Sequence, residues 1–140
     1  MTTYESSEKV IYANVTKVFE QLSDIKKLDI LKEKIGETQG IRNFEISDTT
    51  VSFDTDLAGK ISLSLAEKIP NSAVKYTLKS MLKDADIQMN IKEMTENETS
   101  LKISIAADIP VMFKMMLGNK LSEGIEKLAD GVAASLNATR

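Results

Sequence analysis

The residue types that carry most acid–base and nucleophilic chemistry are missing from this chain. Its 140 residues include no His and no Cys. Without them there is no Ser-His-Asp or Cys-His arrangement, no thiolate and no imidazole metal ligand. Asp, Glu, Lys and Tyr remain, and each needs a strongly shifted pKa to act as an acid or base near neutral pH. The sequence therefore predicts no catalytic residues, no metal and no cofactor.

The most interesting polar side chain is that of Tyr76, which falls mid-strand on an apolar side together with Val74 and Leu78. A tyrosine hydroxyl that faces a core needs a hydrogen-bond partner. A ligand oxygen or a backbone carbonyl can fill that role, and both alternatives stay open. The acidic candidates Asp54 and Asp56 fall on the polar side of their strand, where we expect solvated charges and no acid–base pair.

Apolar and polar residues alternate over most of the segment Ile41–Asp108. A period of two with one apolar side is typical of half-buried antiparallel strands. A further strand is expected from about Tyr4 to Ala13. The sequence thus predicts a sheet of about seven strands with one apolar face.

Helical signals stand on either side of the strands. Asn14 is a good N-cap for a first helix, and the apolar spacing over 25–35 predicts a second short one. Pro110 suits the first turn of a long helix that ends at about Asn137. At ~1.5 Å per residue this helix is roughly 40 Å long, enough to cover about seven strands at ~4.8 Å each. We therefore predict an α+β fold and a single domain over 1–140.

The segment after the first strand resembles a known superfamily. The residues Ile11–Asn14, Val18-Phe19 and Leu22–Asp24 are similar to the opening of SRPBCC proteins (START, Bet v 1-like, polyketide cyclase/dehydrase-like). Members usually have Pro and Trp where this chain has Asn14 and Phe19. The resemblance implies a helix-grip fold, in which a curved antiparallel sheet wraps around a long C-terminal helix and encloses an apolar cavity. Members bind lipids, sterols or polyketides, and some are cyclases.

The resemblance implies binding of a small hydrophobic molecule, lipid- or polyketide-like, between the sheet and the last helix, without catalysis. One alternative is a cyclase/dehydrase-like enzyme in which Tyr76 or a buried carboxylate steers an enolate. Another is a protein-interaction module or homodimer that uses the segment Met112–Leu117. The side chains expected to line the site, for which a packed core is the alternative reading, are Phe53, Leu63, Leu65, Tyr76, Leu78, Met89, Ile91, Ile103, Met115, Met116 and Ile125.

The start of the long helix conflicts with a straight amphipathic pattern. A straight helix would place Lys114 on the same stripe as Leu121 and Ile125, and burying a lysine without a partner is costly. A kink or break near Gly118-Asn119 would remove the conflict. The methionine-rich segment Met112–Leu117 can instead line a cavity entrance, form a dimer contact or pack on the short helices.

Two glycines of the same helix, Gly124 and Gly131, are seven residues apart and lie on one side of it. Glycine lowers helix propensity, so we interpret the pair as a place where the helix approaches the sheet or another helix closely. The glycines follow no strand and form no phosphate-binding loop, which excludes nucleotide binding.

The charge balance excludes two further classes of function. The chain has 18 Lys+Arg against 21 Asp+Glu, a net charge of −3, with no basic cluster. We therefore expect no nucleic-acid partner. No apolar stretch approaches the roughly 20 residues of a membrane span, and the first residues lack a signal-peptide pattern. The expected location is the cytoplasm.

Overall fold

The computed structural model describes residues 2–24, 41–47, 50–55, 59–80, 84–108 and 111–138, and it leaves out the side chains of residues 41, 55 and 111–121. The described part forms one eight-stranded antiparallel sheet in the order β1-β8-β7-β6-β5-β4-β3, with β2 also paired to β8. The elements in chain order are β1 (Thr2–Glu5), β2 (Lys9–Ile11), α1 (Val15–Ser23), β3 (Ile41–Ile46), β4 (Thr50–Thr55), β5 (Gly59–Ile69), β6 (Ala73–Lys79), β7 (Ala85–Thr95), β8 (Glu98–Ala107) and α3 (Val111–Ala138).

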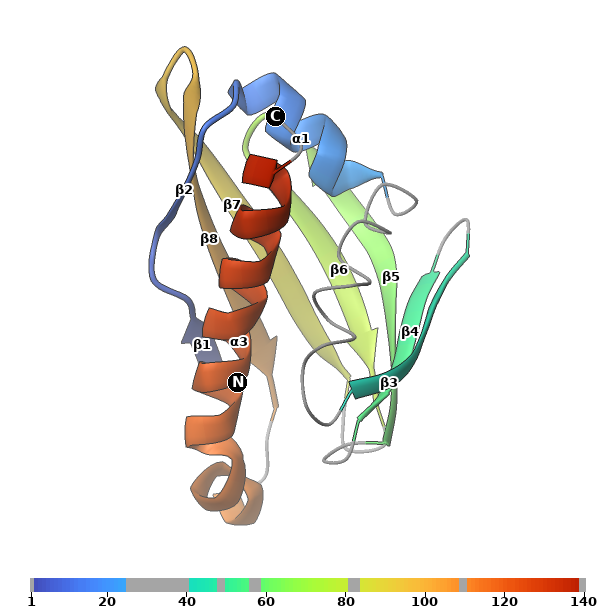
Figure 1. Ribbon diagram of the computed structural model, residues 1–140. Coiled ribbons are helices and arrows are strands. Elements are labelled where there is room, and N and C mark those ends of the chain that lie inside the picture. Colours follow the sequence, from blue (N-terminus) through green and yellow to red (C-terminus); the bar gives the residue numbers. More distant parts are fainter. Residues whose placement is uncertain are drawn as a thin grey trace.

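The two described helices cover one face of the sheet (Figure 1). The long helix α3 packs mainly against β8, β2 and β1, and the short helix α1 packs across β6, β7 and β8. The predicted α+β architecture, with a final helix over the apolar face, is confirmed. The predicted second short helix over 25–35 lies outside the described residues.

The hydrophobic core lies between these helices and strands β6 to β8. Its most deeply buried members come from every covering element: Ile11, Val18, Leu22, Val74, Tyr76, Leu101, Ile103 and Val132 are at most 2% exposed. Burying one such aliphatic side chain stabilises a fold by about 1.5–3 kcal/mol. The core therefore fixes α1 and α3 to the same face of the sheet.

The first predicted strand is broken, so the expectation of one strand from Tyr4 to Ala13 is wrong. The backbone N–H of Ser6 donates to the Ile103 carbonyl at 2.8 Å, but the Ile103 N–H donates to the Ser6 Oγ at 3.0 Å. A side-chain oxygen thus takes the place of a backbone carbonyl in the ladder. The result is two short strands, β1 and β2, which both pair with β8.

Helix α1 begins where the sequence predicts. Asn14 caps it, since its Oδ1 accepts from the Thr16 N–H at 2.9 Å, and its Nδ2 donates to the Glu96 carbonyl at 3.1 Å. The buried Thr99 hydroxyl donates to the Ala13 carbonyl at 2.8 Å. These bonds fix the start of α1 to the turn between β7 and β8.

Helix α3 spans Val111–Ala138, close to its predicted range. It continues without a break past Gly118 and Asn119. The side chains of Lys114, Met115 and Met116 lie outside the described part of the chain. The alternatives for the segment Met112–Leu117 therefore stay predictions.

Candidate ligand-binding site

The predicted lining residues on strands β4 to β8 share the helix-facing side of the sheet but differ in exposure, while the side chains of Met115 and Met116 lie outside the described part of the chain. Leu65 pairs directly with Tyr76, and Leu63 with Leu78, so these side chains lie on one face. Toward β7, β8 and α3 the face is closed: Tyr76, Met89, Ile91, Ile103 and Ile125 are at most 6% exposed. Toward β4 and β5 it is only half-buried, at Phe53, Leu63, Leu65 and Leu78.

One row of paired residues crosses this face from strand to strand. It runs Val51, Leu63, Leu78, Ala85 and Ala107, each directly opposite the next. Its members on β4, β5 and β6 are large, whereas those on β7 and β8 are alanines. Both alanines are buried, at 7% exposed, and each fills less volume on this face than a leucine would. The sequence-based list missed them because they add little apolar surface of their own.

One flank of α3 holds small residues beside open space. At 100° per residue, Gly124, Gly131 and Ser135 lie within about 40° of each other around the helix axis. Among the described residues, a Cβ atom added at either glycine would meet no heavy atom within 4 Å. The predicted close approach of the helix backbone at these glycines is therefore wrong for the part of the structure that is described. Within the described part of the structure, the positions beside these glycines are open.

Ser135, which the sequence analysis missed, is 5% exposed. Among the described residues its Oγ is the one buried side-chain N or O atom without a hydrogen-bond partner. The spacing of four residues from Gly131 is a signal that could have drawn attention to it.

The hydroxyl of Tyr76 has a partner within the protein. It donates to the backbone carbonyl of Leu22, which lies in the last turn of α1, where helix carbonyls lack helical partners. Of the two partners considered for the Tyr76 hydroxyl, a ligand oxygen or a backbone carbonyl, the structure shows the backbone carbonyl. Burial raises the pKa of the Tyr76 phenol, and the nearby charge of Asp24 adds to this shift. The phenol stays protonated near neutral pH.

The acidic candidate Asp54 does not join this face. Asp54 Oδ2 accepts from Asn43 Nδ2 at 2.7 Å, between β4 and the edge strand β3. Asp56 lies outside the described residues. In the part of the chain that the structure describes, no group of three or more acidic residues could hold a metal ion.

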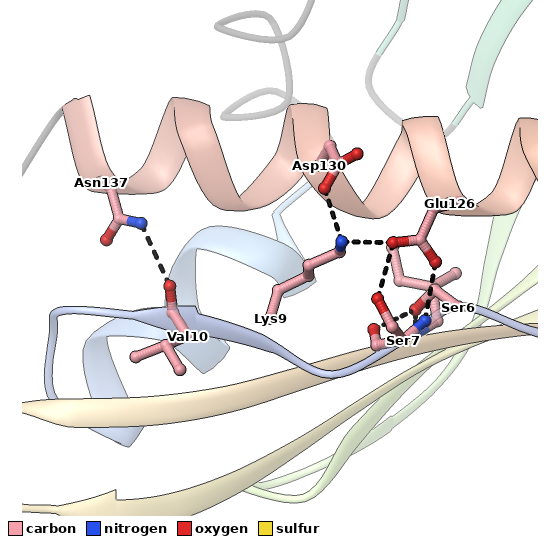
Figure 2. A network of polar contacts seen from close by, with 8 residues as sticks. Ser6, Ser7, Lys9, Val10, Glu126, Asp130 and Asn137 are labelled. Atoms are coloured by element: carbon pink, nitrogen blue, oxygen red, sulfur yellow. Dashed lines mark hydrogen bonds and ion pairs between the residues drawn. The ribbon is translucent and has the colours of Figure 1, made fainter.

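The opposite flank of α3 forms a polar clamp on the broken first strand (Figure 2). The carboxylate of Glu126 accepts from the Ser7 N–H at 2.8 Å and from the Ser7 hydroxyl at 2.6 Å. The ammonium group of Lys9 contacts Glu126 and lies 2.6 Å from Asp130 Oδ1. Hydrogen bonds from Lys9 and Ser7 lower the pKa of Glu126 to about 2.

Asn137 continues this clamp along β2. Its Oδ1 accepts from the Tyr12 N–H at 2.8 Å, and its Nδ2 donates to the Val10 carbonyl at 3.1 Å. The amide side chain thereby takes the place of a neighbouring strand and covers an exposed sheet edge. Sequence reasoning missed the clamp, although Glu126, Asp130 and Asn137 lie within about 40° around the helix.

The clamp predicts how stability depends on pH. Because folding lowers the pKa of Glu126 from 4.5 to about 2, its contribution is present above pH 4.5 and is lost as the pH falls toward 2. Glu126→Gln should therefore be less stable than wild type in urea unfolding at pH 6, and this difference should shrink between pH 4.5 and 2. The exposed Glu123→Gln is the matched control on the same helix. A difference that stays constant with pH would contradict the clamp.

Comparisons with known proteins identify the fold of this chain. No protein-family model matches the sequence, and no curated protein matches it at a significant level. Among solved structures, a START superfamily protein from Mycobacterium smegmatis is 12% identical with a TM-score of 0.67, covering 99% of both chains. The chain has a START-like helix-grip fold. The fold that the sequence resemblance implies is thereby confirmed.

Two other solved structures match over similar lengths. Norcoclaurine synthase from Thalictrum flavum, solved with dopamine and hydroxybenzaldehyde, is 11% identical with a TM-score of 0.75, covering 99% of this chain and 89% of its own. A conserved protein from Geobacillus kaustophilus is 13% identical with a TM-score of 0.70, covering 99% and 97%. Neither described helix of the START-like chain has both the length and the hydropathy of a bilayer-spanning segment.

Proposed function

We propose that this START-like protein binds a small hydrophobic molecule, lipid- or polyketide-like, between the helix-facing side of the sheet and α3. The observation that carries the proposal is the uneven cover of this face. Leu63, Leu65 and Leu78 are only half-buried, and a Cβ atom added at Gly131 of α3 would meet no heavy atom within 4 Å among the described residues. Ligand sites are concave and mostly apolar, with a few polar groups that fix orientation.

Two further observations favour binding without catalysis. The chain has no His and no Cys, and the buried hydroxyl of Tyr76 already donates to Leu22. A cyclase-like reaction needs a group that can give or take a proton at the substrate. Norcoclaurine synthase, whose structure is similar to this one and was solved with dopamine and hydroxybenzaldehyde, supports small-molecule binding on this fold.

The test uses the uncharged fluorescent probe N-phenyl-1-naphthylamine. Wild-type protein should give a saturable, blue-shifted increase in probe fluorescence. Leu63→Trp places an indole in the half-buried part of the site, and it should weaken binding by about tenfold, or about 1.4 kcal/mol. The matched control is Ser64→Trp, because the next residue along β5 points to the other face of the sheet.

Probe binding is compared only between proteins that fold. Thermal unfolding first establishes that both variants fold. The absence of saturable binding by wild type would contradict the proposal. An equal loss of affinity in Leu63→Trp and Ser64→Trp would show that the probe binds elsewhere.

A further inference from the structure

We propose that Ser135 is the polar anchor of the ligand site, and that the ligand is a hydrophobic molecule with one neutral hydroxyl or carbonyl group. This inference rests on the proposed function and deepens it. It depends on three observations: a buried hydroxyl without a partner, open space one helical turn away, and a graded exposure along the helix.

The first observation is the unsatisfied hydroxyl. Ser135 is 5% exposed, and its Oγ has no hydrogen-bond partner among the described residues. The large majority of buried side-chain polar atoms in proteins have a partner. A helical serine can bond to the carbonyl four residues before it, but no such bond forms here. A bound molecule would supply the missing partner.

The second observation concerns the direction of the side chain. Cα–Cβ bonds of a helix tilt toward its N-terminus, so a side chain covers the preceding turn. For Ser135 that turn contains Gly131, four residues earlier. A Cβ at Gly131 would meet nothing within 4 Å among the described residues. The Ser135 hydroxyl therefore borders the open space beside the helix.

The third observation is the change in exposure along this flank. Gly124 is exposed, Gly131 is half-buried and Ser135 is buried. Exposure along this flank of α3 thus decreases from Gly124 to Ser135. A ligand that enters along α3 would place its polar group innermost, at Ser135, and its apolar part beside the glycines.

The surroundings select a neutral polar group. The acidic residues of the clamp, Glu126 and Asp130, lie on the other flank of α3 and are paired with Lys9. Burying a carboxylate or ammonium group at Ser135 without a counter-ion would be unfavourable. A hydroxyl or carbonyl group needs only the one hydrogen bond that Ser135 can form.

The experiment compares 2-naphthol with 2-methylnaphthalene as competitors of N-phenyl-1-naphthylamine. The two competitors have similar shape and differ in one hydroxyl group. Wild-type protein should prefer 2-naphthol by about 3- to 10-fold, the usual net effect of one hydrogen bond. Ser135→Ala should abolish this preference and leave the affinity for 2-methylnaphthalene equal or higher. The variant should fold, because alanine removes an unsatisfied buried group and favours helix.

A second variant tests the space itself. Gly131→Leu should stabilise α3 because leucine has the higher helix propensity, and its side chain should occupy the open space. We expect a higher melting temperature together with at least about tenfold weaker binding of both competitors. The control is Ala134→Leu, which adds a similar side chain at an exposed position of the same helix.

The outcomes separate the two levels of the proposal. If wild type binds neither competitor nor the fluorescent probe, the proposed function fails and the anchor fails with it. If both competitors bind and Ser135→Ala keeps the preference for 2-naphthol, only the anchor is overturned. Unchanged binding by Gly131→Leu would overturn the position of the ligand beside this flank.

Discussion

Replacing Ile103 by alanine is expected to lower the free energy of unfolding by about 2–5 kcal/mol. Ile103 is fully buried at the middle of β8, directly opposite Met89 on β7. Its backbone also bonds to Ser6 on the first-strand side. Because β7, β8 and the core around them are held from several sides, the cavity left by the substitution has little freedom to collapse. Urea unfolding measures the change.

The same substitution at Leu63 supplies the contrast. Leu63 has a similar place in the alternating pattern but is only half-buried. Leu63→Ala should cost about 1 kcal/mol, because less apolar surface returns to water and a smaller cavity forms. If Ile103→Ala and Leu63→Ala lost equal stability, the helix-facing side of the sheet would be as well covered at β5 as at β8. The proposed site would then have no room.

Removing the hydroxyl of Tyr76 should have the second largest effect, a loss of about 1–3 kcal/mol for Tyr76→Phe. The ring keeps its packing in the variant, but the buried carbonyl of Leu22 loses its donor. The C-terminal turn of α1 should open more often, which hydrogen exchange at this turn would detect. Tyr4→Phe removes the same atom from a half-buried ring on β1 and should change stability by no more than about 0.5 kcal/mol.

The Tyr76 variant also distinguishes structural from ligand-binding roles. Since the hydroxyl is already engaged by Leu22, Tyr76→Phe should bind N-phenyl-1-naphthylamine as wild type does. A variant with normal stability and lost probe binding would reverse this assignment. It would place the hydroxyl of Tyr76 at the ligand.

Local patterns predicted much of the fold. The period-two alternation from β3 to β8, the cap at Asn14 and the extent of α3 depend on neighbours in sequence, so they could be found without a structure. The break between β1 and β2 could not. It depends on a bond between Ser6 and Ile103, which are 97 residues apart, and a serine in an otherwise strand-like segment gives no sign of its distant partner.

The sequence could predict which residues of the candidate site share one side of the sheet. It could not predict which of them the helices leave uncovered. Alternation places Leu63 and Ile103 on the same side of the sheet, yet only the position of the helices decides which of them is covered. The glycines of α3 show the same limit. Gly131 has the helix spacing expected of a close contact, while the distance from helix to neighbouring atoms is a property of the assembled structure. The predictions for Met115 and Met116 stand as made.

The pairing of β1 and β2 with β8 has a consequence for the newly made chain. These first strands acquire their neighbour only after roughly one hundred further residues have left the ribosome, and their other edge is closed later still, by Asn137 and Glu126. Contacts of such long sequence separation slow folding. We therefore expect the apolar strands of the nascent polypeptide to stay incompletely paired and covered until translation of α3 is almost over. This delay gives chaperones a long interval in which to bind.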